Sequence, residues 1–166
     1  NIDKLEVMVL GGTWGSYPEY YRYDFIRDLY YAANTFYVDN DKRPKPHSLL
    51  EEQFINESAI VRIIGLTLET RPDHLYSREI QLLNMYNCTR VQVGVQSLDD
   101  KVMKKLNRGC YYNDVVRGIK NLLDCGFKVD IHIMFDLPFV TSEEDKEMFD
   151  KLLADSNVRF DQAKLY

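Results

Sequence analysis

The feature that most constrains this chain is a regular alternation of short apolar runs with longer amphipathic segments. Four apolar runs occupy residues 5–10, 61–68, 90–95 and 128–134, and a fifth run ends at Tyr166. A helical pattern follows each of the first four runs, and no hairpin turn signal joins any two of them. The alternation therefore predicts an α/β fold built of βαβ units with a parallel sheet. Periodicity alone leaves open whether this is an open doubly wound sheet or part of a (β/α) barrel.

The segments between the strands carry start signals for helices. Ser48 with Glu51 forms a capping box that opens a short helix, and Thr141 with Glu144 opens the last one. The remaining helices are expected over residues 18–36, after Pro72, over 98–107 and over 113–125.

Apolar periodicity predicts which side chains these helices bury. In the first helix the buried face includes Ile26, Ala33 and Phe36, and in the helix after Pro72 it includes Tyr76 and Ile80. By contrast, residues 39–46 are rich in Asp, Lys and Pro and are expected to form a loop.

Composition excludes several classes of protein. The chain has 166 residues, which corresponds to one domain or a large part of one. Its net charge of −5 provides no global basic field of the kind that marks nucleic-acid binding, although a local basic groove stays allowed. The longest apolar run, 60–68, contains Arg62 and is too short to span a bilayer. With no signal-peptide pattern at the amino terminus, we expect a cytoplasmic or nuclear protein without a membrane partner.

The cysteines give no sign of a metal site in this chain. Cys88, Cys110 and Cys125 are separated by 22 and 15 positions, and no pair has the close spacing of a zinc or iron–sulfur ligand set. The chain also lacks an initiator Met and stops within an apolar run at Tyr166. We therefore expect it to be a fragment of a longer protein.

Glycine or polar residues follow each apolar run at the point where the strand is expected to end. In parallel α/β proteins this edge holds the functional site, because the carboxyl ends of the strands lie side by side. The candidate ligand-binding set consists of Gly11, Gly12 and Thr13, then Glu69 and Arg71, then Gln96 and Ser97 with Arg108 beyond the next helix, and finally His132 and Met134.

The first two groups of this set have structural interpretations beside the functional one. Gly11 and Gly12 allow a ligand to approach the backbone closely, or they make an ordinary tight turn. Glu69 can accept hydrogen bonds from ribose hydroxyls, or it can form an ion pair with Arg71 or another buried cation.

The later groups of the set also have both a structural and a functional interpretation. Ser97 can bind a ligand or can be the N-cap of the following helix, with Asp100 three residues on. Arg108 can clamp a carboxylate in bidentate fashion, but a cation at a helix C-terminus is favourable without any ligand. A single His on an apolar strand, such as His132, is more often a core residue with satisfied hydrogen bonds than a catalyst.

Several stretches, in the same order along essentially the whole chain, carry a family resemblance. They are Gly-Gly-Thr at 11–13, Leu-Glu-Thr-Arg-Pro-Asp at 68–73, Cys-Thr-Arg-Val-Gln-Val-Gly-Val-Gln-Ser at 88–97, Asn-Arg-Gly at 107–109, Gly-Phe-Lys-Val at 126–129, His-Ile-Met-Phe-Asp-Leu-Pro at 132–138 and the closing Lys-Leu-Tyr. The chain thereby resembles the radical S-adenosylmethionine domain of the Elongator catalytic subunit, a family that modifies wobble uridines of tRNA towards carboxymethyluridine. The resemblance implies that 1–166 is a partial TIM-type (β/α) barrel, with parallel strands alternating with helices.

The resemblance also implies roles for individual residues. Gly11, Gly12 and Thr13 match the glycine motif that holds the amino group of S-adenosylmethionine, although Thr13 stands where the wider superfamily has a glutamate. Glu69, Gln96 and Arg108 match positions that contact the ribose and the amino-acid carboxylate of this cofactor. His132 falls where several relatives have an aspartate near the adenosine.

In such a family a [4Fe–4S] cluster donates an electron to S-adenosylmethionine and releases a 5′-deoxyadenosyl radical. This radical is thought to abstract a hydrogen atom from an acetyl group, and the resulting carbon radical adds to uridine. The resemblance places the three cluster cysteines before residue 1 and the acetyl-CoA site after residue 166. It implies tRNA as a partner, together with segments outside this chain, and Elongator-type accessory subunits as further partners. We therefore expect the fragment alone to be inactive.

Two other functions stay open at this point. The chain can belong to a different radical S-adenosylmethionine enzyme with another substrate, against which the motif at 68–73 argues. It can also be a degenerate, non-catalytic barrel kept as a binding module. The full-length gene would discriminate, through the presence or loss of the upstream cysteines and of a downstream acetyltransferase domain.

Overall fold

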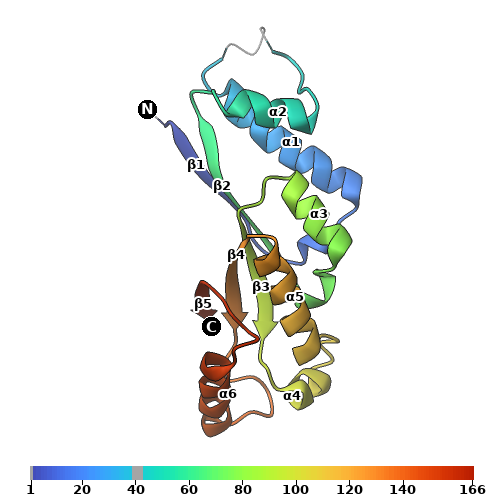
Figure 1. Ribbon diagram of the computed structural model, residues 1–166, viewed down its shortest axis with the longest axis vertical. Helices are drawn as coiled ribbons and strands as arrows, with labels where there is room; N and C mark the ends of the chain where they lie inside the picture. The colour runs from blue at the N-terminus through green and yellow to red at the C-terminus, as the bar shows by residue number, and fades with distance from the viewer. Residues whose placement is uncertain (1, 39–42) are drawn as a thin grey trace.

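The computed structural model describes residues 2–38 and 43–166, in which five parallel strands form one sheet. Their spatial order follows the chain, β1-β2-β3-β4-β5, and each strand pairs in parallel with the next. The sheet twists and curls into half of a barrel (Figure 1), which confirms the predicted fold class. The strands are β1 Lys4–Val9, β2 Arg62–Thr70, β3 Arg90–Gln96, β4 Lys128–Ile133 and β5 Gln162–Leu165.

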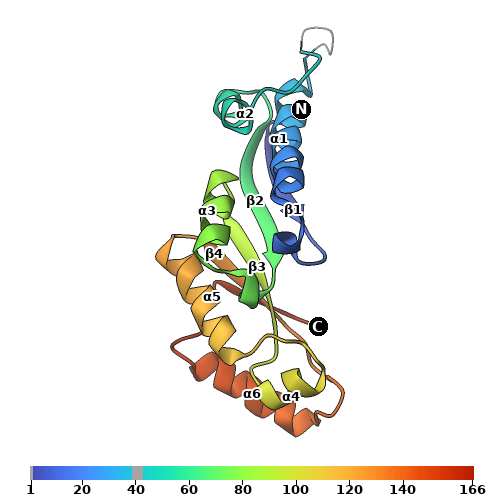
Figure 2. The same cartoon turned by 90° about the vertical axis from the view of Figure 1, so that its right-hand side faces the viewer.

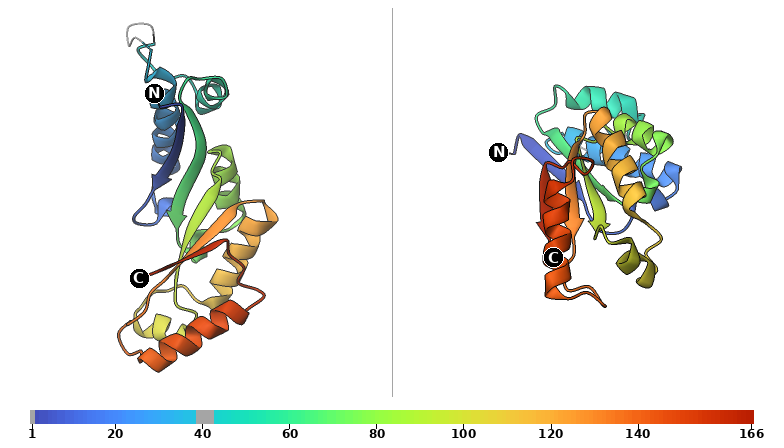
Figure 3. Two further views of the ribbon diagram at one scale, coloured as in Figure 1. Left: turned by 90° about the vertical axis from the view of Figure 1, so that its left-hand side faces the viewer. Right: turned by 60° about the horizontal axis from the view of Figure 1, so that its bottom comes forward.

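Helices connect successive strands and lie mainly on one face of the sheet (Figure 1 and Figure 2). The left view of Figure 3 shows the opposite face, where no described helix covers β1 and β2. The helices are α1 Glu19–Thr35, α2 Leu49–Asn56, α3 Ser77–Met85, α4 Asp100–Lys105, α5 Tyr112–Asp124 and α6 Ser142–Ala154, with single 3₁₀ turns η1 Trp14–Ser16 and η3 Pro72–His74.

The core lies between the sheet and the helices that cover it. Strand side chains such as Leu68 and Ile131 are fully buried, as are Leu83 of α3 and Ile119 of α5. Because alternate strand residues point to opposite faces, the residues between these apolar positions point to the uncovered face. That face is the inside of the half-barrel.

The inner face carries a row of polar residues instead of the apolar layers of a filled barrel. Glu69 pairs in register with Gln92, and Gln92 pairs with Asp130. Two residues further along β4, His132 pairs with Lys164 of β5. Gln92 and Asp130 are each only 1% exposed. The polar residues of the inner face therefore form a partly enclosed surface that extends to the carboxyl ends of the strands.

Local signals predicted most helix starts correctly. The capping boxes at Ser48 and Thr141 are both present, and each serine or threonine hydroxyl accepts from the backbone N–H three residues on. Ser97 is not the N-cap of α4, which begins at Asp100: the carboxylate of Asp99 accepts from the N–H groups of Lys101 and Val102 instead. The expected helix over 98–107 is correspondingly shorter.

Two of the predicted buried side chains are exposed. Phe36 is 61% exposed because α1 ends at Thr35, and Tyr76 is 53% exposed because it precedes the first residue of α3. Helical periodicity does not apply beyond the helix ends, so neither side chain points at the core. The loop expected over 39–46 lies outside the described residues at 39–42, and residues 43–46 form neither helix nor strand.

Candidate functional site

The end of β3 is irregular. Val93 pairs with Ile131 but Gln96 pairs with Ile133, so one extra residue is inserted in β3 as a β-bulge. Gln96 has a φ of 70°, in the left-handed region. A Cβ added at Gly94 would lie 3.2 Å from Nε2 of Gln96 and 3.3 Å from Nη2 of Arg108. A glycine at 94 therefore lets the side chains of Gln96 and Arg108 both lie close to the backbone of β3, and a larger residue would displace them.

Arg108, in the loop after α4, completes this cluster. Its Nη2 donates to the carbonyl oxygen of Gly94 at 3.3 Å. Its Nε and the Oε1 of Gln96 are both buried and have no hydrogen-bond partner in the described part of the chain. Burial lowers the pKa of the guanidinium, and the positive charge of Arg71 lowers it further. Because unpaired buried polar atoms cost free energy, this arrangement suits a ligand that offers both an acceptor and a donor.

The glycine turn after β1 is attached to β2 by a carboxylate. The backbone N–H of Gly11 donates to Oε2 of Glu69 at 2.9 Å. Gly11 and Gly12 have φ angles of 91° and 77°, which other residues rarely adopt, and no atom lies within 4 Å of an added Cβ at Gly11. A cavity of about 110 Å³ opens here between Gly11, Glu69, Trp14 and Tyr17. The glycine turn thus leaves its backbone accessible beside an acidic group.

His132 lies next to Glu69 on the inner face. Its Nε2 is 3.1 Å from Oε1 of Gln92, and its Nδ1 is 3.5 Å from Oε1 of Glu69. The ring of Tyr166 packs edge-on against the imidazole at 5.3 Å between centroids. Burial lowers the pKa of His132, partly offset by the negative charge of Glu69. The structure therefore places His132 in a polar chain from β3 to β2, not among apolar side chains.

Arg71 does not pair with Glu69. Its Nε and Nη2 form two hydrogen bonds of 2.9 Å with the carboxylate of Asp73, and Nη2 also donates to the backbone carbonyl of Arg108 at 2.8 Å. The hydrogen bond with Asp73 raises the pKa of Arg71. Arg71 therefore holds the backbone that carries Arg108, with its own charge already paired.

The remaining predicted residues contribute mainly through the backbone or through turns. The Ser97 hydroxyl accepts from the N–H of Asp99 at 3.2 Å, and the N–H of Met134 donates to the carbonyl of Gln96 at 2.9 Å. The carbonyl of Thr13 accepts from the N–H of Ser16 at 2.9 Å and thereby closes η1. These contacts shape the strand ends around the two clusters just described.

Two polar residues that sequence reasoning did not select lie beside these clusters. Gln92 is buried and contacts His132, and Thr70 at the end of β2 has a buried hydroxyl with no hydrogen-bond partner in the described segments. The available signal was a polar side chain inside an apolar run. That signal is weak, because such residues also occur where a sheet face is solvent-exposed.

Nothing in the described residues forms a metal centre or a membrane span. No group of three or more His, Cys, Asp or Glu side chains within 2–38 and 43–166 could hold a metal ion, and none of the described helices is long and apolar enough to cross a bilayer. Burial raises the pKa of the Cys88 thiol to about 12 and that of Cys110 to about 11. Both thiols are therefore protonated at neutral pH.

Comparison with known proteins gives a consistent result. The Radical SAM superfamily model matches residues 5–153. Elongator complex protein 3 of Homo sapiens is 37% identical over all 166 residues, and that of Saccharomyces cerevisiae is 34% identical over the same span. The chain spans 29% and 28% of the length of these two relatives.

Solved structures match in the same way. The archaeal Methanocaldococcus infernus Elp3 with an N-terminal deletion superposes with a TM-score of 0.90 at 34% identity, covering 99% of this chain and 37% of that one. The radical SAM enzyme coproporphyrinogen III oxidase of Escherichia coli shares the fold at a TM-score of 0.58 and 11% identity, covering 98% of this chain and 42% of that one.

Proposed function

Because this chain belongs to the Radical SAM superfamily, we propose that its strand-end site binds S-adenosylmethionine within a larger tRNA-modifying enzyme. The proposed reaction is that of a tRNA carboxymethyluridine synthase, which uses acetyl-CoA to carboxymethylate the wobble uridine. The similarity to Elongator complex protein 3 over the full chain supports this choice of substrate. It also supports Elongator-type accessory subunits as partners, with a cytoplasmic or nuclear location.

The unpaired buried atoms at the end of β3 carry the proposal. Gln96 Oε1 accepts from no group and Arg108 Nε donates to none among the described residues, although both are buried. The amino-acid part of S-adenosylmethionine has an ammonium group that donates and a carboxylate that accepts. The chemistry of this ligand therefore fits the two orphan atoms.

The neighbouring residues fit the rest of the cofactor. The open backbone at Gly11 and Gly12 allows the ligand to approach closely, and Glu69 Oε1 is available to accept from a hydroxyl or an ammonium group. Met134, whose N–H donates to the carbonyl of Gln96, is 39% exposed and offers a polarizable apolar side chain to the same ligand. Arg71 and Ser97 support the site by holding the chain on either side of Arg108 and Gln96.

The chemistry that bound S-adenosylmethionine supplies in this superfamily is hydrogen-atom abstraction by a carbon-centred radical, after one-electron reduction by a [4Fe–4S] cluster. The described residues offer no ligand set for such a cluster. We assign the cluster ligands, the acetyl-CoA site and much of the tRNA contact to segments outside 1–166. The role of this chain is to bind and orient the cofactor and to limit access of water to it.

Substitution of Arg108 tests the proposed site. In the reconstituted full-length protein, Arg108→Ala should weaken S-adenosylmethionine binding by about tenfold or more, since a charged hydrogen bond contributes about 1.5–3 kcal/mol. Isothermal titration of the wild type and the variant measures the effect. Unchanged affinity would mean that Arg108 only completes the turn after α4.

The isolated chain tests whether the cluster ligands lie outside residues 1–166. Purified 1–166 under reducing conditions should not cleave S-adenosylmethionine, because the described residues offer no cluster ligands. Release of 5′-deoxyadenosine, followed by chromatography, measures cleavage. Turnover by the fragment would refute the assignment of the cluster to other segments.

A further inference from the structure

The guanidinium of Arg71 is fixed in one orientation by a neighbouring carboxylate. Its Nε and Nη2 donate to the two carboxylate oxygens of Asp73, each at 2.9 Å. Such a bidentate pair fixes the plane of the guanidinium. Nη2 carries a second hydrogen and donates it to the backbone carbonyl of Arg108 at 2.8 Å. Arg71 therefore extends from the end of β2 to the loop after α4 and binds that loop at one defined atom.

The backbone of Arg108 is held on both sides of its Cα atom. Its N–H donates to the carbonyl of Met103 at 3.0 Å, and its carbonyl accepts the bond just described. The flanking residues Asn107 and Gly109 have φ angles of 53° and 66°, in the left-handed region. Within the described residues the Arg108 side chain makes one hydrogen bond, of 3.3 Å, to the carbonyl of Gly94. The place of its guanidinium is therefore set mainly by the backbone from which it extends.

The turn after β2 lies directly against α5. This turn, residues 71–75, is called the support turn and contains η3. A Cβ added at Gly118 of α5 would lie 3.0 Å from the carbonyl oxygen of Pro72 and 3.2 Å from Cβ of Leu75. Three residues further along α5, Asn121 Nδ2 donates to the carbonyl of Leu75 at 3.0 Å. Because glycine is a poor helix former, its presence in the interior of α5 is explained by this close approach.

Charge explains why Asp73 belongs to the arrangement. Burial lowers the pKa of the Arg108 guanidinium and the positive charge of Arg71 lowers it further, whereas the charge of Asp73 raises it. Asp73 also forms the ion pair that neutralises Arg71. Two arginines can therefore lie close together, and Arg108 is the one whose buried Nε has no partner in the described segments.

We propose that Arg71 is a positioning residue, which acts on the ligand only through Arg108, and that Gly118 and Asn121 fix the support turn from which it acts. This inference rests on the proposed function only for the ligand that Arg108 binds. A direct contact between Arg71 and the ligand is the alternative that the strand-end position also allows. The proposal places determinants of ligand binding on α5, a helix that covers the outer face of the sheet (Figure 2).

A double-mutant cycle on the reconstituted full-length protein tests the role of Arg71. In otherwise wild-type protein, Arg71→Met should weaken S-adenosylmethionine binding by about three- to tenfold. In the Arg108→Met background the same change should cost less than about twofold, because residues that act through one another are not additive. Isothermal titration measures the four affinities. Arg78→Met, which removes only the exposed ion pair with Glu19, is the control and should bind as the wild type does.

Two results of the cycle would overturn the positioning role. An equal loss of affinity in both backgrounds would show that Arg71 contacts the ligand itself. A lower unfolding free energy in Arg71→Met with unchanged affinity would show that Arg71 only stabilises the fold.

Gly118→Ala tests the contact with α5 without removing any polar group. The new methyl group should displace the Pro72 carbonyl by a few tenths of an ångström and weaken S-adenosylmethionine binding by about threefold. Alanine itself favours the helix, so the variant should fold. Lys120→Ala, at an exposed position of α5, is the control and should leave the affinity unchanged. Wild-type affinity in Gly118→Ala would overturn the role assigned to α5.

Hydrogen exchange of the ligand-free protein separates this inference from the proposed function. In Arg71→Met the backbone amides of residues 107–110 should exchange several-fold faster than in the wild type, because the Arg108 carbonyl has lost its donor. Unchanged exchange there would overturn the inference even if the affinity falls. Faster exchange in a protein whose wild type binds no S-adenosylmethionine would contradict the proposed function and support the hold of Arg71 on the Arg108 backbone.

Discussion

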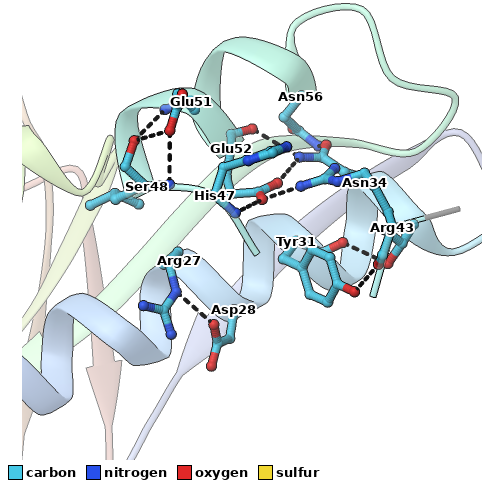
Figure 4. Close-up of polar contacts among 12 residues, drawn as sticks. Arg27, Asp28, Tyr31, Asn34, Arg43, His47, Ser48, Glu51, Glu52 and Asn56 are labelled. Atoms are coloured by element: carbon cyan, nitrogen blue, oxygen red, sulfur yellow. Dashed lines mark hydrogen bonds and ion pairs between the residues drawn. The ribbon is translucent and has the colours of Figure 1, made fainter. Parts of the chain in front are cut away.

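Two buried polar clusters lie towards opposite ends of the sheet, one near the start of β2 and one at the carboxyl ends of the strands, and they differ in how completely their hydrogen bonds are made. The first joins α1 and α2 (Figure 4). There Asn34 Nδ2 donates to Glu52 Oε2 at 2.8 Å, and Asn56 Nδ2 donates to Asn34 Oδ1 at 2.7 Å. Arg43 and the N–H of His47 satisfy the other carboxylate oxygen. Every side-chain amide and carboxylate oxygen of Asn34, Glu52 and Asn56 has a partner.

The second cluster, at the carboxyl ends of the strands, is left incomplete. Arg108 Nε, Gln96 Oε1, Thr70 Oγ1 and Gln92 Nε2 are buried without partners in the described part of the chain. The first cluster has one such atom among the described residues, Nε of Arg43, while its amide and carboxylate groups are all paired. The comparison therefore contrasts a nearly complete network, which stabilises the fold, with a less complete one whose unpaired atoms suit a ligand.

The largest effect on stability is expected at the satisfied end. Glu52→Ala leaves the buried Asn34 and the partly buried Arg43 without their carboxylate, which should cost about 3–5 kcal/mol of unfolding free energy. Chemical denaturation measures the loss. Glu57→Ala, at an exposed position just after α2, is the control, and it should change the unfolding free energy by no more than about 0.5 kcal/mol. A loss no larger than that of the control would show that the α1–α2 network does not stabilise the fold.

The next effect is expected at Gly94. In Gly94→Ala the new methyl group would meet Gln96 and Arg108 at 3.2 and 3.3 Å, so those side chains must move. We expect S-adenosylmethionine affinity to fall at least tenfold with about 1–3 kcal/mol of destabilisation. Gly65→Ala in β2 is the matched control, because its Cβ would meet the Glu6 side chain at an ordinary 3.5 Å. If Gly94→Ala and Gly65→Ala bind S-adenosylmethionine with equal affinity, the β-bulge of β3 does not contribute to ligand binding.

Arg108 should affect binding far more than stability. Its burial already lowers the pKa of the guanidinium, and within the described residues its side chain makes one hydrogen bond, to the carbonyl oxygen of Gly94. Arg108→Met, which keeps the aliphatic volume, should therefore change the unfolding free energy by less than about 1 kcal/mol, since replacing a buried charge by an apolar group is often neutral. Denaturation and titration of the same sample measure both quantities. Destabilisation comparable to that of Glu52→Ala would remove the contrast between the two ends.

The smallest effect is a pH dependence confined to the site. Because the pKa of His132 is lowered in the folded state, its contribution to stability is fully present above the unfolded pKa of about 6.5 and is lost as pH falls through the folded value. Wild type should therefore lose stability on acidification relative to His132→Asn. Denaturation series from pH 7.5 to pH 5 measure the difference, and parallel curves would exclude His132 as the titrating group.

Local sequence predicted the elements and the edge at which the site lies. Capping boxes at Ser48 and Thr141 are satisfied within one helical turn, so four residues are enough to predict them. The same locality explains the errors at Phe36 and Tyr76. α1 ends one residue before the expected Phe36, and the helix expected to follow Pro72 begins only at Ser77, after a 3₁₀ turn over Pro72–His74. The prediction of a half-barrel instead of an open sheet came from the family resemblance, because periodicity does not distinguish the two.

Partner choice among the polar side chains was decided by tertiary structure alone. The sequence offered Arg71 as a partner for Glu69, but Arg71 pairs with Asp73, and Glu69 holds the N–H of Gly11, 58 positions away. Gln92 was not selected at all, because its partner His132 is 40 positions distant. By itself the sequence determined which residue types reach the strand ends. Only the register of neighbouring strands and the bulge before Gln96 decided which of them touch, because those contacts depend on distances across the sheet.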